Sequence, residues 1–243
     1  MSAFYAEDLA HIHDQGFGSF AQAATPFVLR TLASRATGNP VVVELGCGSG
    51  ITATALVQKG YSVLGVDTSA AMLEFACKRA PGAELRQASV YDTELPECAA
   101  VLSIGECLGY APESSSKREQ LFALFPKLQR ALASGGFLLF DLLTTDHARR
   151  VQPYQAFREG KGWTVVFEIV PDLEKQELIR RIISFRLVGE HYRRSTETHR
   201  IFLYETAEII QGLRVSGFQV QVLEGYGTLR FREGHLGFLA EKL

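Results

Sequence analysis

Apolar and polar positions follow two different rhythms along this chain. Short apolar runs bounded by glycine or charged residues predict buried strands over residues 41–45, 61–67, 84–88, 99–104 and 137–141. Between these runs, apolar residues spaced three and four apart predict helices over residues 51–57, 70–76 and 121–132. Strands that alternate with helices are typical of a parallel sheet covered on both faces. We therefore expect an α/β fold with a doubly wound sheet.

The rhythm changes to long stretches of period two between residues 146 and 204. Strands are predicted there over residues 163–170, 178–188 and 199–204. The residues expected on one buried face are Val165, Phe167, Ile169, Ile183, Phe185 and Leu187. This pattern predicts an antiparallel β insertion between the fifth strand and the last helix. The helix expected over 206–215 and the strands over 218–223 and 237–242 then complete a sheet of seven strands.

The run from Val41 to Gly50 contains the strongest functional signal. Three valines lead into Glu44, and glycines follow at Gly46, Gly48 and Gly50, directly before the helix that begins at Ile51. Backbone amides of such a loop and the positive end of the helix face whatever lies above the strand. A dinucleotide fingerprint would need a glycine where Ile51 stands. The loop therefore indicates a nucleotide-type ligand, and Ile51 argues against a nicotinamide dinucleotide.

A second acidic residue supports this interpretation. Asp67 ends the next predicted strand, 17 residues after Gly50, where a carboxylate can accept hydrogen bonds from both hydroxyls of a ribose. An Asp at this place also caps helices in many proteins, and glycines after a strand also form plain turns. The two features together at this spacing favour the ligand site.

This pair of features resembles the first motifs of the class I S-adenosylmethionine-dependent methyltransferases, in which a hydrophobic run precedes E/D-x-G-x-G-x-G. The match covers residues 40–145 well and residues 205–243 less closely, and it does not cover the insertion. It implies a Rossmann-like seven-stranded sheet of the bacterial small-molecule type, with S-adenosylmethionine as cofactor and S-adenosylhomocysteine as product. The cofactor-binding residues that it implies are Glu44, Gly46, Cys47, Gly48, Gly50, Asp67, Thr68, Met72, Ser89, Val90 and Gly105. Ser89 stands where the family usually has an Asp that binds the adenine amino group.

The resemblance also implies a division of the chain. Residues 1–145 and 205–243 are expected to form the methyltransferase core, with residues 1–36 as a helical lid that Gly16 and Gly18 interrupt. Residues 146–204 are expected to cover the acceptor site. A chain of 243 residues with 47% hydrophobic content is long enough for one large domain with such an insertion.

No catalytic residue follows directly from the chemistry, because methyl transfer mainly requires the nucleophile to be held about 3 Å from the methyl carbon. A base is needed only when the acceptor arrives protonated. Glu106, which follows the fourth predicted strand, is one candidate, and His11 and Tyr5 in the lid are the others. A plain alternative is that Glu106 caps a helix and that His11 is a surface residue.

The charge pattern bears on the acceptor. The formal net charge is −2, which gives no overall attraction for nucleic acid or anionic membranes. Residues 146–204 hold 11 Lys or Arg against 8 Asp or Glu, an excess of 11 − 8 = +3. These arginines fit a solvated sheet face with cross-strand ion pairs, which we favour, or a cover that recognises an anionic or nucleic-acid group.

We therefore expect transfer of a methyl group to nitrogen or oxygen of a small molecule. The alternatives are an RNA or protein acceptor, a nicotinamide-dependent oxidoreductase, and a non-catalytic cofactor-binding module. The four cysteines form no Cys-x-x-Cys pair, the chain has no metal-ligand motif, and no apolar run approaches the ~20 residues of a membrane span. These features favour a reduced, cytoplasmic protein without metal. They leave the oligomeric state open between monomer and homodimer.

Overall fold

A seven-stranded sheet forms the centre of the protein in the computed structural model, which describes residues 4–35, 40–111 and 118–243. Its strands are β1 (Val41–Leu45), β2 (Ser62–Asp67), β3 (Glu84–Gln87), β4 (Cys98–Ser103), β5 (Leu132–Leu143), β10 (Phe218–Leu223) and β13 (His235–Lys242). They lie in the order β10-β13-β5-β4-β1-β2-β3. Strand β13 runs antiparallel to both of its neighbours, and the other neighbouring pairs are parallel. The α/β fold and its seven-stranded sheet are thus confirmed.

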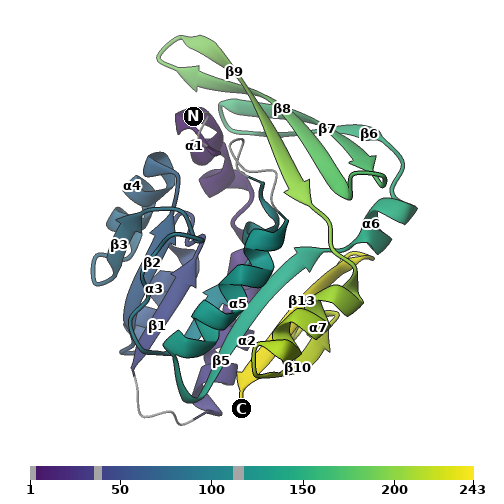
Figure 1. The fold of residues 1–243 in the computed structure, drawn as a ribbon. Helices are drawn as coiled ribbons and strands as arrows, with labels where there is room; N and C mark the ends of the chain where they lie inside the picture. Colours follow the sequence, from purple (N-terminus) through teal and green to yellow (C-terminus); the bar gives the residue numbers. More distant parts are fainter. Residues whose placement is uncertain (1–3, 36–39, 112–117) are drawn as a thin grey trace.

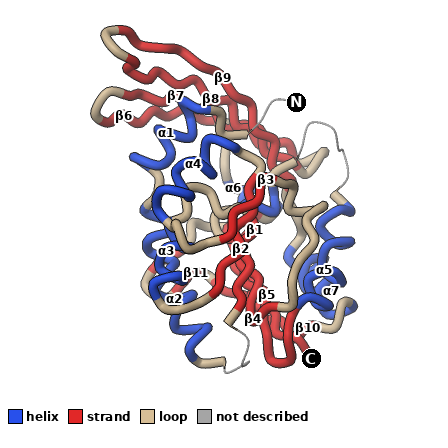
Figure 2. Tube along the Cα trace, turned by 90° about the vertical axis from the view of Figure 1, so that its left-hand side faces the viewer, coloured by secondary structure: helices blue, strands red, loops and turns tan. Residues whose placement is uncertain are grey.

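Helices cover both faces of this sheet (Figures 1 and 2). One face carries α2 (Ser19–Ala33) and α3 (Ile51–Gln58), and the other carries α5 (Glu119–Ala131) and α7 (Thr206–Val215). Alternate strand residues supply the two cores, because successive side chains of a strand point to opposite faces. Val43 and Leu45, for example, pack under α5 and α7, whereas Val42 packs under α2 and α3.

The order of β1 and β4 creates the place for a ligand. The chain moves outward from β1 to β2 and β3 on one side, and from β4 to β5 on the other. The loops after β1 and β4 therefore separate at the carboxyl ends of these strands. Open α/β sheets bind ligands at such a switch point. Helices α1 (Glu7–Gly16) and α4 (Ala70–Arg79), together with the short turn η1 (Cys107–Gly109), lie at this end of the sheet.

A second sheet of four antiparallel strands stands above these carboxyl ends (Figure 1). It consists of β6 (Tyr154–Gly160), β7 (Trp163–Asp172), β8 (Glu177–Val188) and β9 (His191–Phe202). Short helix α6 (Thr145–Arg150) leads into it from β5. A small hairpin, β11 (Gly225–Tyr226) with β12 (Leu229–Arg230), packs against α2 of the large domain. Leu9 and Ile12 of α1 pack against Trp163, Val165 and Ile182 of the second sheet.

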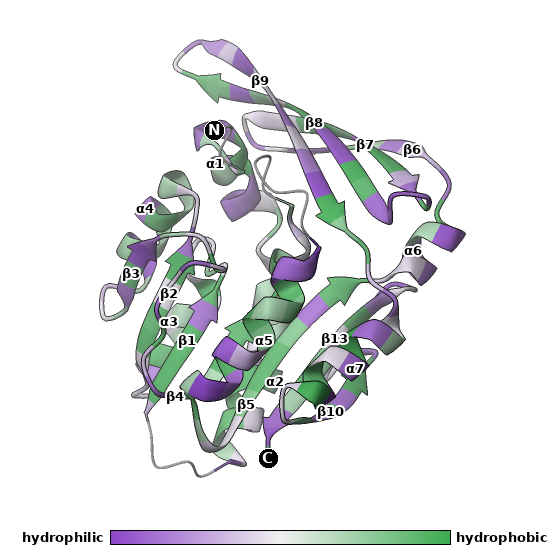
Figure 3. Ribbon diagram, in the orientation of Figure 1, coloured by the Kyte–Doolittle hydropathy of each residue, from purple (hydrophilic) through white to green (hydrophobic). Residues whose placement is uncertain are grey.

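The sequence prediction for this region has two errors. It lacks strand β6 altogether, and it begins β9 at His199, whereas the strand begins at His191. Both segments are largely exposed, so their side chains show little apolar alternation (Figure 3). Hairpin pairing with β7 and β8 places them in the sheet.

The predicted buried face of β8 is also wrong. Leu178, Ile182 and Ser184 are buried, whereas Leu187 on the predicted face is 43% exposed. The register pairs Val165 with Ser184 and Ile169 with Arg180, so the even positions of β8 share the inner face with the odd positions of β7. Both faces of β8 carry large apolar residues, and periodicity therefore could not distinguish them.

Most of the insertion's arginines take part in ion pairs. Arg181 binds Glu168 across the strands at 2.6 Å, and Arg193 binds Asp8 of α1 at 2.5 Å. These pairs agree with the favoured interpretation of a charged sheet surface. Arg180, by contrast, lies on the inner face. No helix within residues 4–35, 40–111 and 118–243 is long and apolar enough to cross a membrane.

The segment predicted as a lid, residues 1–36, contains α1 and α2, of which α2 packs in the core of the large sheet; residues 1–3 and 36 lie outside the described residues.

Candidate active site

A cavity of about 600 Å³ lies between the carboxyl ends of the large sheet and the inner face of the second sheet. This volume falls in the range of roughly 300–1,000 Å³ that is usual for small-molecule sites. One end is formed by the glycine loop and Asp67, and the other by arginines, tyrosines and a histidine. Helices α1 and α2 close the side through residues such as Leu9 and Phe20.

The glycine loop leaves its end of the cavity free of side chains. Gly46 has a φ of 74°, and a Cβ there would lie 2.6 Å from the Cys107 sulfur, so only glycine fits. Gly48 has a φ of 52°, and a Cβ there would meet no atom within 4 Å. Positive φ angles are costly for other residues. The backbone at Gly48 is therefore open to close approach by a ligand.

Asp67 holds this loop in place at the end of β2. Its Oδ2 accepts a hydrogen bond of 2.9 Å from the Gly48 amide, and its Oδ1 accepts one of 2.9 Å from the Ser69 amide at the start of α4. Burial raises the pKa of Asp67, although the amide hydrogen bonds act in the opposite direction. Each oxygen keeps a further lone pair, so the carboxylate can bind the loop and a ligand together.

Glu44 is a buried acid at the base of the cavity. Its side chain is 4% exposed, and its Oε2 has no hydrogen-bond partner among the described residues. Burial raises the pKa of Glu44 to about 8. An unpartnered buried polar atom is costly, which indicates that a donor from a ligand belongs there.

The predicted cofactor residues divide into two groups. Those that line the cavity are Glu44, Gly46, Cys47, Gly48, Asp67, Met72 and Gly105. Those outside its lining are Gly50, Thr68, Ser89 and Val90. Gly50 is the N-cap of α3, and the Ser89 hydroxyl accepts a hydrogen bond from the Tyr91 amide at 3.2 Å.

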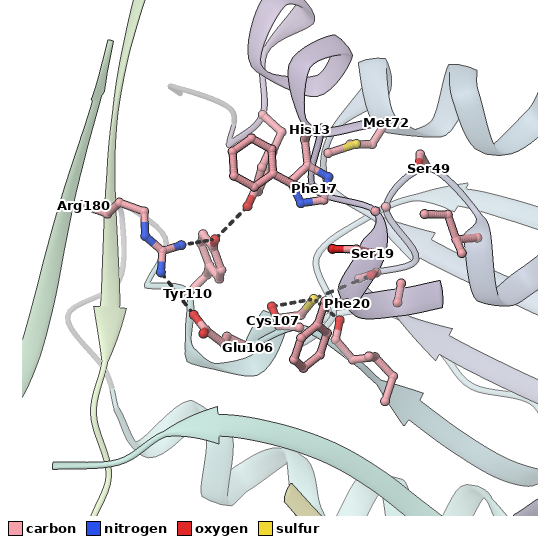
Figure 4. Close-up of a pocket in the computed structure, with 18 of the residues that line it drawn as sticks. His13, Phe17, Ser19, Phe20, Ser49, Met72, Glu106, Cys107, Tyr110 and Arg180 are labelled. Atoms are coloured by element: carbon pink, nitrogen blue, oxygen red, sulfur yellow. Dashed lines mark hydrogen bonds and ion pairs between the residues drawn. The ribbon is translucent and has the colours of Figure 1, made fainter. Parts of the chain in front are cut away.

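The other end of the cavity contains a chain of hydrogen bonds that links the segment before α1 to the second sheet (Figure 4). The hydroxyls of Tyr5 and Tyr110 lie 2.9 Å apart, and Arg180 of β8 donates to the Tyr110 hydroxyl at 3.2 Å. Arg180 also donates to Glu106 Oε2 at 3.3 Å. Burial raises the pKa of both tyrosines, so both are neutral. Tyr5 has a φ of 54°, a strained conformation for this residue type.

Glu106 is held as a carboxylate between two arginines. Arg232 donates to its Oε1 at 2.5 Å, and Arg180 binds its Oε2. Burial alone would favour the neutral acid, but the charges of Arg180 and Arg232 outweigh it and lower the pKa to about 2. A carboxylate so stabilised is a weak base.

The structure adds a histidine that sequence reasoning missed. His235, at the start of β13, donates from Nε2 to Oδ2 of Asp141 at 2.7 Å. Asp141 also accepts hydrogen bonds from the amides of Gly105 and Glu106, both at 2.9 Å, and from the Tyr226 hydroxyl at 3.0 Å. Because Asp141 binds Nε2–H, the Nδ1 atom of His235 is left as an acceptor. No local pattern marks a histidine that follows a turn, so only the pairing of β5 with β13 reveals it.

The two histidines of α1 have different surroundings. His11 lies outside the cavity lining, with its ring 6.3 Å from that of Phe75. His13 lines the cavity and stacks on Phe17 at 5.9 Å. Burial lowers the pKa of His13 to about 4, so it is neutral near pH 7. Of the three candidate catalytic residues, Tyr5 and Glu106 therefore line the cavity and His11 does not.

Comparisons with known proteins agree with this geometry. A family model described as a methyltransferase domain matches residues 42–136, which contain the glycine loop, Asp67 and Glu106. The dTDP-3-amino-3,4,6-trideoxy-alpha-D-glucopyranose N,N-dimethyltransferase of Streptomyces venezuelae is 23% identical, over 91% of this chain and 94% of its own length. Residues 42–136 of this chain are therefore a methyltransferase domain.

Two solved structures show how far the fold of this methyltransferase is shared. An S-adenosylmethionine-dependent methyltransferase from Clostridium acetobutylicum ATCC 824 has a TM-score of 0.79 and 17% identity, and 96% of this chain and 97% of that one are covered. The sugar N-methyltransferase KedS8 from Streptoalloteichus sp ATCC 53650 has a TM-score of 0.78 and 18% identity, with 100% and 96% covered. Both similarities extend through the second sheet, so this cover belongs to the shared fold.

The cavity of this methyltransferase fits its cofactor. The unpartnered Oε2 of Glu44 suits the ammonium group of a methionine moiety, and the open backbone at Gly48 suits close approach. The free lone pairs of Asp67 suit ribose hydroxyls. All three residues line the same cavity.

Proposed function

We propose that this methyltransferase transfers a methyl group to nitrogen or oxygen of a small-molecule acceptor. The proposal rests on one observation: the second sheet and α1 together cover the cavity above the glycine loop. The second sheet contributes Phe167, Ile169 and Arg180 to the cavity wall, and α1 is fastened to the same sheet. A cavity of about 600 Å³ is suited to a cofactor together with a small acceptor rather than to a folded macromolecule.

In this proposal, the residues at the glycine-loop end of the cavity bind and orient the cofactor. Glu44, Gly46, Gly48 and Asp67 would hold S-adenosylmethionine, which when bound supplies an electrophilic methyl group. The apolar walls exclude water from this end, and a dry site strengthens the charged hydrogen bonds made inside it. The alignment of the acceptor atom then contributes most of the rate.

His235 takes the proton of the acceptor in this proposal. Its Nε2–H is held by Asp141, and its Nδ1 is the free acceptor atom. A proton gained at Nδ1 is stabilised by Asp141 on one side and by Glu106 Oε1, 4.0 Å away, on the other. Glu106 thus stabilises charge in the site, and Tyr5 closes the acceptor end through Tyr110.

The first test is thermal unfolding with S-adenosylmethionine, S-adenosylhomocysteine, NAD and NADP. A ligand at 100 times its dissociation constant adds roughly 2.7 kcal/mol of stability. We expect a rise in melting temperature with the two sulfur ligands and none with the nicotinamides. Methyl transfer is then screened with small amines and alcohols, and against total RNA and protein. Activity with RNA or protein only would contradict the small-molecule proposal.

A further inference from the structure

The cavity lining carries an excess of positive charge. Four arginines line the cavity, namely Arg158, Arg180, Arg230 and Arg232, against the carboxyl groups of Glu44, Asp67 and Glu106. The formal charge of this lining is therefore 4 − 3 = +1, in a protein whose formal net charge is −2. Such a local concentration of one sign attracts ligands of the opposite sign.

The carboxylate of Glu106 already pairs with two of these arginines. Glu106 places one oxygen 2.5 Å from Arg232 and the other 3.3 Å from Arg180, so the three groups together keep a charge of +1. Asp141 lies behind this wall and is occupied by two backbone amides, a tyrosine hydroxyl and His235. It does not line the cavity.

Arg180 has donors to spare. Its side chain is 19% exposed, and its side-chain partners among the described residues are Tyr110 and Glu106, one N–H for each. A guanidinium carries five N–H donors in a planar fork that matches a carboxylate or a phosphate. The other two arginines, Arg158 and Arg230, form no ion pair among the residues that the structure describes, and Arg158 lies over the ring of Phe17 at 5.2 Å.

We propose that the methyl acceptor carries an anionic group, a carboxylate or a phosphate, which binds between Arg180 and Arg232. This inference rests on the proposed small-molecule function and specifies the class of its substrate. The anion accepts hydrogen bonds from the remaining N–H groups of Arg180. It also neutralises the net charge of +1 that Arg180, Arg232 and Glu106 have together. The nucleophilic atom then lies on the side of His235, whose imidazole is 4.0 Å from Glu106.

Glu106 is paired with two arginines that differ in exposure, whereas a purely structural ion pair requires only one. One carboxylate suffices to pair Arg180, yet Arg232 reaches the same Glu106 from the loop before β13 while its own side chain stays 45% exposed. Arg180 thus supplies a fixed cation from the wall, and Arg232 supplies one from the rim of the cavity. An anion between them would be held by both elements.

The test is calorimetric titration of the protein already saturated with S-adenosylhomocysteine, at constant ionic strength. The probes are pyrophosphate, citrate and, as a cationic control, putrescine. The variants are Arg180→Gln and Arg232→Gln, with Arg181→Gln as the matched control. Arg181 is next to Arg180 but on the outer face of β8, where it pairs with Glu168.

We expect pyrophosphate or citrate to bind to the wild type and putrescine not to bind. Each of the two site variants should lose at least tenfold in anion affinity, and Arg181→Gln should match the wild type. Preference for pyrophosphate over citrate assigns a phosphate, and the reverse assigns a carboxylate. Arg232→Gln is informative even where Arg180→Gln fails to fold, because Arg232 is half exposed.

Two results overturn the inference. One is that neither anion binds to the saturated wild type, and the other is that Arg180→Gln and Arg232→Gln bind anions as the wild type does. Failure of S-adenosylhomocysteine itself to bind is seen in the preceding saturation step, and it would contradict the proposed function instead.

Discussion

His235 donates its Nε2–H to Asp141 at 2.7 Å, so a carboxylate on β5 orients an imidazole on β13. We predict that His235→Gln lowers kcat at least about 100-fold, because a positioned base contributes roughly 10²–10⁴ to a rate. Added imidazole should restore part of the activity, which loss of packing alone would not allow. The measurement is steady-state kinetics with the acceptor found by the screen. His191→Gln, on the exposed start of β9, is the control, and a kcat within threefold of wild type would refute the role of His235.

Asp67 joins the glycine loop to α4, and we predict that Asp67→Asn weakens S-adenosylmethionine binding at least tenfold. The amide removes a charged acceptor, and such hydrogen bonds contribute about 1.5–3 kcal/mol each. Calorimetric titration measures the affinity, and unfolding of the ligand-free variant separately reports the loss of the bonds to Gly48 and Ser69. Asp92→Asn, at an exposed turn, serves as the control. Unchanged affinity in Asp67→Asn would remove Asp67 from the cofactor site.

Glu44 makes stability depend on pH. Its pKa is raised from 4.5 to about 8 in the folded protein, so between these values the folded state keeps a proton that the unfolded state has lost. The free energy of unfolding should therefore fall as pH rises from about 4.5 to 8 and level off above it. In Glu44→Gln this contribution is absent, and the variant should gain stability relative to wild type as pH rises. Urea unfolding from pH 5.5 to 8.5 measures the difference, and a constant difference would contradict the prediction.

Asp8 fastens α1 to the second sheet. Its carboxylate binds Arg193 Nε and Nη2 at 2.7 and 2.5 Å and the Ser195 hydroxyl at 2.7 Å, and its side chain is 5% exposed. We predict that Asp8→Ala lowers the free energy of unfolding by about 2 kcal/mol, less than loss of a fully buried pair, because Arg193 is 43% exposed.

The same variant should release the ligand faster. Stopped-flow measurement of S-adenosylhomocysteine dissociation should show a rate at least fivefold higher in Asp8→Ala, because α1 closes one side of the cavity. Glu7→Ala removes a neighbouring carboxylate that is 71% exposed and should leave the rate unchanged. Equal dissociation rates in wild type and Asp8→Ala would show that α1 does not act as a lid.

Local patterns determined the framework of the large domain. The run from Val41 to Gly50 has an apolar strand, a side-chain-free loop and a helix start within ten residues, so neighbours in the sequence carry the whole signal. The same holds for Asp67 at the end of its strand. Such features depend on backbone conformation and burial over a few residues, which apolar periodicity and glycine positions report directly.

The acceptor end depended on tertiary structure instead. In the sequence, Arg180 is only one of the 11 Lys or Arg of residues 146–204, and the predicted face of β8 is the wrong one because both faces carry large apolar residues. Only the pairing of Ile169 with Arg180 places that guanidinium over the cavity. Register between strands is set by long-range contacts and not by either strand alone.

The sequence by itself determined the seven-stranded α/β fold and the glycine loop that lines the cavity, because each was encoded within a few consecutive residues. Tertiary structure alone decided which side chains meet at the acceptor end: His235 and Asp141 are 94 positions apart, and Arg180 and Glu106 are 74 apart. Groups so distant come together only after the sheet closes and the insertion folds back over it. Charge pairing at such distances leaves no periodic trace in the chain.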